Sequence, residues 1–188
     1  MNESLLLFAI GIQKFEVTNW EDKKPKLLEL IEFEDNKVIE CQTDYYLHST
    51  RPPYFDSFVE ILQDDLDNMA NEYTEGLSDR YNGECPFRGL DDWQLWSQSY
   101  TEGQYHGAHN NGMMNISNVL YVEFDESQHI PTTFYSPFPN PFYGTISKAT
   151  PPVKEGNIIS FPSLLLHECP VQSSTTPRTI MSFNIPLR

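Results

Sequence analysis

The stretch Glu155–Asn184, EGNIISFPSLLLHECPVQSSTTPRTIMSFN, guides the interpretation of the whole chain. His167 ends the apolar run that begins at Phe161, and Arg178 follows eleven residues later, just before a second apolar run. An imidazole can bind a metal ion, and a guanidinium pairs best with a carboxylate where water is excluded. A histidine that closes a strand is also often a satisfied core residue, and Arg178 alone could be a surface residue. Their combination predicts a functional site.

Upstream, the segment Gly103–Gly112, GQYHGAHNNG, places His109 and Asn111 two residues apart. On an extended segment, side chains at positions i and i+2 point to the same face, so both can reach one ion. The alternative is a simple turn, because Asn-Gly is a common hairpin dipeptide. Two histidines and one carboxylate on one face of an Fe(II) ion leave positions open for other ligands. The order His109, His167, Arg178 favours such a metal site.

The sequence around these segments predicts short strands. Trp93–Thr101 alternates, with Trp93, Leu95, Ser97 and Ser99 on one face and Gln94, Trp96, Gln98 and Tyr100 on the other. Further strands are expected at 118–124, 132–135, 157–161 and 179–185. Many short strands, separated by turns in a chain with 14 prolines, indicate a sandwich or barrel.

The N-terminal half carries two predicted helices. Tyr54–Glu75 has an apolar stripe at helical spacing, with Gly76 placed for a left-handed cap. Its other face holds Asp64, Asp65, Asp67 and Glu72, which we expect to be solvated. A shorter helix is expected at Asp22–Phe33, and strands at Leu5–Ile12 and Val38–Cys41, the latter after a turn at 34–37. The aromatic, proline-rich loop Tyr135–Gly144 is predicted to be a lid or a stiff connection.

Charge and cysteine content narrow the function classes. The net charge is −15 with only 12 Lys and Arg residues, so neither nucleic acid nor an anionic membrane is an expected partner. Cys41, Cys85 and Cys169 form no C-x-x-C pair, which argues against a disulfide framework and favours a reducing compartment. Leu5–Ile12 lacks the flanks of a signal peptide. We therefore expect a cytoplasmic protein of undetermined oligomeric state.

These motifs together resemble the 2-oxoglutarate- and Fe(II)-dependent oxygenases, in particular the short members found in marine bacteriophages and bacteria. The resemblance covers residues 93–188. It rests on the following segments: Tyr100-Thr-Glu-Gly103, His109-Asn-Asn111, Ser117-Asn-Val-Leu-Tyr-Val122, Gly156-Asn-Ile-Ile-Ser-Phe-Pro-Ser163, His167, Pro170 and Arg178-Thr-Ile-Met-Ser-Phe-Asn184.

The resemblance implies a mainly β fold, a double-stranded β-helix or cupin-like jelly roll whose mouth holds iron. We expect one domain over residues 1–188, with N-terminal strands and supporting helices in 1–92 and the β-helix core with its metal site in 93–188. The implied cofactors are Fe(II) and 2-oxoglutarate. His109, Asn111 and His167 match the metal positions. Arg178 matches the 2-oxoglutarate anchor, with Ser182, Tyr121 and Asn118 as further cofactor-binding candidates.

Asn111 departs from the family pattern, which has an acid or a histidine at this position. Its side chain offers a neutral carbonyl oxygen, a weaker donor for a hard cation than a carboxylate. His106 and His129 are the other nitrogen donors that could complete the site. Glu168, next to His167, would point to the opposite side of a strand.

Three functions are open to such a chain. The first is a dioxygenase that converts 2-oxoglutarate to succinate and hydroxylates a small molecule or a protein side chain, in the host cytoplasm if the chain is phage-encoded. The second is a catalytically inactive jelly roll that serves as a binding or virion component. The third is another enzyme or a sugar-binding jelly roll without a metal. Iron content and succinate release distinguish the first from the others.

Overall fold

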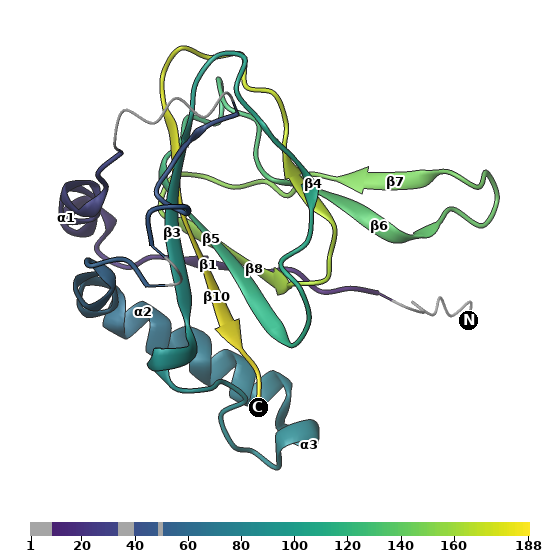
Figure 1. Cartoon of the computed structure of the whole chain (residues 1–188). Coiled ribbons are helices and arrows are strands. Elements are labelled where there is room, and N and C mark those ends of the chain that lie inside the picture. Colours follow the sequence, from purple (N-terminus) through teal and green to yellow (C-terminus); the bar gives the residue numbers. More distant parts are fainter. Residues whose placement is uncertain (1–8, 34–39, 49–50) are drawn as a thin grey trace.

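The computed structural model describes residues 9–33, 40–48 and 51–188. Two antiparallel sheets form its centre, and helices pack on one side (Figure 1). The expectation of a mainly β chain with N-terminal helices is confirmed. The elements in chain order are β1 (Gln13–Glu16), α1 (Trp20–Leu30), β2 (Gln42–Thr43), α2 (Phe55–Gly76), α3 (Ser78–Tyr81), the 3-10 turn η1 (Leu90–Asp92), β3 (Gln94–Tyr100), β4 (His106–His109), β5 (Asn115–Glu123), β6 (Thr133–Pro139), β7 (Ile146–Ala149), β8 (Asn157–Pro162), β9 (His167–Cys169) and β10 (Arg178–Pro186).

The larger sheet has the strand order β1-β8-β5-β10-β3-β2. Its central strand, β10, pairs antiparallel with β5 on one side and with β3 on the other. The register against β5 shifts between Thr179 and Ile180, a local irregularity near the start of β10. Both N-terminal strands join this sheet: β1 pairs with β8, and β2 pairs with β3. The N-terminal half is therefore integrated with the C-terminal strands.

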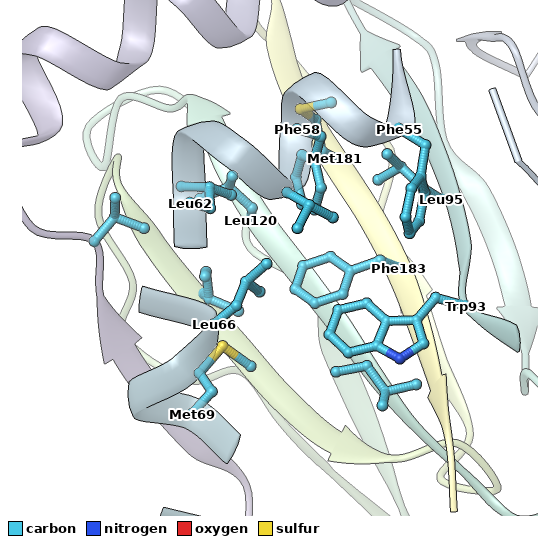
Figure 2. Close-up of a cluster of buried hydrophobic side chains, with 14 of the residues drawn as sticks. Phe55, Phe58, Leu62, Leu66, Met69, Trp93, Leu95, Leu120, Met181 and Phe183 are labelled. Carbon is cyan, nitrogen blue, oxygen red and sulfur yellow. The ribbon is translucent and has the colours of Figure 1, made fainter. Parts of the chain in front are cut away.

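Helix α2 covers the outer face of the larger sheet (Figure 2). The faces of β3 alternate as predicted, because Trp93 and Leu95 lie in the apolar layer under α2, whereas Tyr100 lies in a separate buried cluster. Phe183 of β10 stacks on Trp93 with ring centroids 6.2 Å apart, and Phe58 of α2 meets Phe183 edge-on at 5.4 Å. One apolar stripe on α2 thus fixes the helix to the sheet.

The end of α2 differs from the prediction. Gly76 is the last helical residue and does not form a left-handed cap. The chain continues into α3, and the left-handed residue after it is Asn82, with φ 52°. The acidic face of α2 is also not fully solvated, because Asp65 is buried. Its carboxylate accepts hydrogen bonds from the backbone N–H and hydroxyl of Thr18 and pairs with Lys23 at 2.5 Å.

The helix and strands predicted in the N-terminal half agree with the structure only in part. The helix expected at Asp22–Phe33 is confirmed as α1. Of the strand expected at Leu5–Ile12, residues 5–8 lie outside the described residues, and 9–12 are not in a strand; the first strand, β1, starts at Gln13. The turn at 34–37 and most of the strand expected at Val38–Cys41 also lie outside the described residues.

The smaller sheet has the order β4-β9-β6-β7 and contains three strands that the sequence did not reveal, namely β4, β7 and β9. The aromatic loop 135–144 lies within and after β6, and the β6–β7 hairpin projects away from the two sheets (Figure 1). This segment is a hairpin arm, not a lid over the mouth.

Two further expectations concern the chain as a whole. The three cysteines are free, as predicted. Within the described ranges, no helix is long and apolar enough to cross a membrane.

Candidate active site

Strands β4 and β9 bring the two predicted metal-binding histidines together. His109 and His167 are register partners across this antiparallel pair, and their ring centroids lie 4.3 Å apart. The register shifts between His106 and His109, so the pairing is irregular beside the site. Residues 58 positions apart in the sequence therefore share one point at the edge of the smaller sheet.

Backbone carbonyls orient both imidazoles. Nδ1 of His109 lies 2.8 Å from the carbonyl oxygen of Gly107, and Nδ1 of His167 lies 2.8 Å from that of Leu165. Because a carbonyl only accepts, each Nδ1 carries the proton and each Nε2 keeps a free lone pair. Burial lowers the pKa of His167 to about 4, which keeps this ring neutral near pH 7. Neutral imidazoles held this way are suited to bind a metal through Nε2.

A third imidazole, His106, stacks on His109 with ring centroids 4.0 Å apart. Its Nδ1 lies 3.2 Å from Nε2 of Gln98, whose Oε1 accepts the indole N–H of Trp96 at 3.2 Å. Since an indole only donates, the Gln98 amide must turn its NH2 group to His106. His106 then carries its proton on Nε2 and has no lone pair left for a metal. Burial and the neighbouring His109 lower its pKa to about 4.

Asn111 lies just beyond β4, and its backbone N–H donates to the carbonyl of Ser163 at 2.9 Å. Its side-chain NH2 donates to the hydroxyl of Ser117 at 3.0 Å. Ser117 donates to Asn184 at 2.7 Å, and Asn184 donates to Gln94 at 3.0 Å. This chain of bonds engages the nitrogen of Asn111 and leaves its carbonyl oxygen as the atom available to a ligand.

The donor set fits a metal that takes two imidazoles and one neutral oxygen. Within residues 9–33, 40–48 and 51–188, no group of three or more His, Cys, Asp or Glu side chains is arranged to hold a metal ion. His109 and His167 are the two nitrogen donors that could hold a metal here, and Asn111 offers a neutral oxygen where a facial triad has a carboxylate.

Arg178 is fully buried, and its guanidinium is only partly satisfied. Nη2 donates to the hydroxyl of Thr132 at 3.3 Å, whereas Nε and Nη1 have no hydrogen-bond partner. The rings of Tyr100 and Tyr121 lie 5.2 and 5.3 Å from its central carbon. A buried cation with two free donors is costly unless a ligand completes it. A carboxylate has the geometry to accept both N–H groups.

The other predicted cofactor residues divide into two groups. Tyr121 donates to Thr132 at 3.0 Å beside Arg178. Ser182 borders the small cavity between the two sheets that Thr132 also lines. Asn118 also borders it, but its amide donates to the carbonyls of Ile116 and Phe183 and accepts from Ser160, on the side that faces α2. Its register partner is Phe183, which belongs to the layer under α2. Asn118 is therefore on the wrong face to bind a cofactor.

The side chains of His129 and Glu168 are engaged by other partners, although Glu168 is among the residues that line the inner cavity. His129 accepts the backbone N–H of Asp125 at 2.9 Å, and its Nε2 lies 3.1 Å from the carbonyl of Thr176. Glu168 points away from His167, as expected, and pairs with Lys148 at 2.9 Å while accepting from Tyr135.

Two cavities meet at these residues. The inner cavity lies between the sheets and is bordered by His109, Asn111, His167, Thr132 and Ser182; its free volume is about 20 Å³. The outer cavity opens from it, shares Trp96, Gln98, His106, His109 and Asn111 with it, and measures about 390 Å³. The inner space suits an ion or a water, whereas the outer one has the size of a small-molecule site.

Sequence reasoning missed Tyr100 and Gln98 as site residues, although both lie on the β3 face that the alternation had separated from Trp93 and Leu95. The pairing of Arg178 with Tyr100 across β10 and β3 would have identified that face as the inner one. No sequence pattern identified Thr132 as a site residue, because it lies before β6 and outside regular structure.

Residues 94–184, from β3 to β10, match the family model described as "Putative 2OG-Fe(II) oxygenase". No curated protein sequence matches the chain. The matched segment contains all the residues of the site described above.

Solved structures with similar folds include a prolyl-4-hydroxylase from Pseudomonas putida, with 12% identity, a TM-score of 0.57 and coverage of 95% of this chain and 94% of that one. A viral collagen prolyl hydroxylase from Paramecium Bursaria Chlorella virus-1, solved with 2-oxoglutarate, has 14% identity, a TM-score of 0.56 and coverage of 94% and 96%. HygX from Streptomyces hygroscopicus, solved with nickel, 2-oxoglutarate and hygromycin B, has 11% identity, a TM-score of 0.58 and coverage of 95% and 83%. The jelly-roll fold is thereby confirmed.

Proposed function

We propose that this chain is a dioxygenase of the 2OG-Fe(II) oxygenase family, whose model matches residues 94–184, and that it hydroxylates a substrate bound in the outer cavity. The cofactors of this family are Fe(II) and 2-oxoglutarate. The single observation that carries the proposal is that the His109–His167 pair borders the inner cavity while the unsatisfied guanidinium of Arg178 is bonded to Thr132, another residue of the same lining.

In this proposal His109 and His167 hold the iron through Nε2. The carbonyls of Gly107 and Leu165 keep each ring in the tautomer that a metal requires. Asn111 supplies its carbonyl oxygen as the third protein donor, because its nitrogen is bound to Ser117. A neutral third donor leaves the ion with more positive charge than a carboxylate would. We therefore expect weaker iron binding than an acidic residue would give.

Arg178 anchors the far carboxylate of 2-oxoglutarate with the two N–H groups that have no partner. Tyr121 holds Thr132, and Thr132 in turn accepts from Arg178, so the tyrosine positions the anchor; Ser182 borders the path between anchor and metal. 2-Oxoglutarate is larger than the inner cavity, so its binding requires the lining side chains to move apart.

When bound, the iron supplies the oxidising chemistry: O2 and 2-oxoglutarate give succinate and CO2, and the second oxygen atom enters a substrate C–H bond as a hydroxyl group. The residues of this chain orient the two cofactors and exclude water. Trp96, Gln98 and His106 line both cavities and form the wall along which a substrate would approach. Two of the structurally similar proteins are prolyl hydroxylases, which supports hydroxylation as the outcome.

The test is release of succinate from 2-oxoglutarate by purified protein supplied with Fe(II), ascorbate and O2. Slow release is expected even without substrate, and both His109→Ala and His167→Ala should abolish it. His129→Ala is the matched control, because this imidazole lies outside the site. Binding of 2-oxoglutarate without any succinate would overturn the proposal and favour a catalytically inactive binding protein.

The free state of the three cysteines supports a reducing compartment, and a cytoplasmic location is part of the proposal. Thiol titration of freshly unfolded protein should find three free thiols. Fewer than three free thiols would contradict a reducing compartment.

A further inference from the structure

The outer cavity has a composition that selects a ligand by charge. Three aromatic side chains, Tyr45, Tyr46 and Trp96, form one part of its lining. Tyr45 meets Trp96 edge-on at 5.4 Å and Tyr46 edge-on at 5.3 Å. Tyr45 is 53% exposed and Tyr46 is 78% exposed, so their rings are open to a bound molecule. Aromatic faces grouped in this way attract cations.

A second part of the lining consists of carboxamides: Gln94, Gln98, Asn110, Asn111 and Asn184. Several of their polar atoms are already engaged, since Gln94 accepts from Asn184 and Asn110 accepts from the backbone N–H of Gly112. The NH2 groups of Gln94 and Asn110 stay available to a ligand. Such neutral groups hydrogen-bond hydroxyl or amide groups without preferring either charge.

Glu40 gives the lining of the outer cavity a negative charge. It lines the outer cavity, and among the described residues that line it there is no Lys or Arg. The loaded inner site keeps one net positive charge, because Fe(II) and the Arg178 guanidinium carry three positive charges against the two negative charges of 2-oxoglutarate. Arg178 is fully buried and does not line the outer cavity. The whole chain carries −15, and Glu40 is the one Asp, Glu, Lys or Arg among the described residues of the lining, so the lining itself carries a negative charge.

We propose that the outer cavity recognises a substrate that carries an ammonium group, which Glu40 pairs with and the rings of Tyr45, Tyr46 and Trp96 surround, while the carboxamides bind the polar groups next to it. This inference rests on the proposed function, since it names the substrate class of that site. Phosphorylated and carboxylated molecules are excluded as substrates by the same lining. The volume of about 390 Å³ admits a small amine or a lysine side chain with its flanking peptide bonds.

The experiment compares probes that differ in charge and little in shape. Glucosamine is set against N-acetylglucosamine and glucuronic acid, and a three-residue peptide with a central lysine is set against its Nε-acetylated form. Binding is measured by ligand-observed NMR, both with metal-free protein and with protein loaded with Zn(II) and 2-oxoglutarate. At least one amine should bind roughly tenfold tighter than its acetylated partner, the ratio expected from a cation–π site assisted by a carboxylate. The probe that binds identifies the source of the ammonium group.

Glu40→Gln should reduce the amine preference to about twofold or less, and Tyr46→Leu should weaken amine binding several-fold. Tyr46 is largely exposed, so its replacement leaves the fold intact. Glu126→Gln is the control, because it removes the same charge from an exposed turn outside the cavity. An acetylated or anionic probe that binds as tightly as the amine overturns the inference, as does an unchanged preference in Glu40→Gln or failure of both amines to bind.

Succinate release and amine binding together distinguish failure of the oxygenase proposal from failure of the substrate proposal. If an amine binds with the expected preference but no succinate is released, the oxygenase proposal fails and the cavity assignment stands. If succinate is released but no amine is preferred, the oxygenase proposal stands and the substrate class is wrong.

Discussion

The two faces of strand β10 have different roles, because one packs against α2 and the other lies between the two sheets. Met181 and Phe183 point to α2 and lie in a buried layer that is mostly apolar. Arg178 and Ser182 point between the sheets, where the guanidinium keeps two donors without partners. The same nine-residue strand therefore holds the fold together with one face and offers binding groups with the other. Substitutions on the two faces should separate stability from function.

The largest effect is expected on the helix-facing side. Phe58→Ala removes a fully buried ring that meets Phe183 edge-on, and we expect it to lower the free energy of unfolding by about 3–5 kcal/mol. Urea denaturation measures this change, with Glu60→Ala on the exposed side of α2 as the control. The protein that remains folded should bind 2-oxoglutarate as well as wild type. A loss of that affinity would show that the two faces are not independent.

Arg178→Met tests the other face. It removes a buried cation whose Nε and Nη1 are unpaired, so the free energy of unfolding should stay the same or rise. The affinity for 2-oxoglutarate should fall by about 100-fold or more, about 2.7 kcal/mol, because the anchor is lost. Calorimetric titration measures this affinity, and Arg80→Met on α3 is the charge-matched control. Unchanged 2-oxoglutarate binding would remove Arg178 from the site.

Asn111→Asp should tighten Fe(II) binding by roughly tenfold, because a carboxylate is a stronger donor for a hard cation than an amide oxygen. Ser117 would then turn its one hydroxyl hydrogen from Asn184 to the new carboxylate, so a small loss of stability should accompany the change. Asn110→Asp is the control, since it adds the same charge one position away. An iron titration that does not change in Asn111→Asp would mean that residue 111 is not a ligand. The third position would then belong to water, since His106 has no lone pair left for a metal.

The smallest effect concerns pH. His106 and His167 have pKa values of about 4 in the folded, metal-free protein, against 6.5 for an exposed histidine. Between these values the unfolded chain binds protons that the folded chain does not, so stability should fall as the pH is lowered from 6.5 towards 4. Denaturation midpoints at several pH values measure this slope. In the His106→Phe variant, stability should fall less steeply as the pH is lowered. An equally steep fall would mean that groups other than His106 cause it.

Long periodic elements were predictable from the sequence. The stripe of α2 and the alternation of β3 are repeated often enough to identify both elements and their buried faces. Strands β4, β7 and β9 have only three or four residues each, too few for a period to be visible. The burial of Asp65 also escaped prediction, because its partners Thr18 and Lys23 lie more than 40 positions away.

The site was predictable where chemistry is carried by rare residue types in a recognisable order. His109, His167 and Arg178 were chosen as candidates this way, and the structure brings the two histidines to register positions of one strand pair. The placement of Asn118 was wrong, because the face of a residue in β5 depends on its partners in β8 and β10. The tautomer of His106 depends on Trp96 through Gln98, a relation that spacing alone does not contain.

The most direct test of the central claim is an anaerobic titration of the protein with Fe(II) and 2-oxoglutarate, followed by visible absorption. A charge-transfer band arises only when the oxo-acid chelates the protein-bound iron, so it reports both cofactors in one cavity. We expect the band in wild-type protein, its loss in His167→Ala, and a need for about 100-fold more 2-oxoglutarate in Arg178→Met. A band that persists in His167→Ala, or that needs no more 2-oxoglutarate in Arg178→Met, would contradict the assignment of this site.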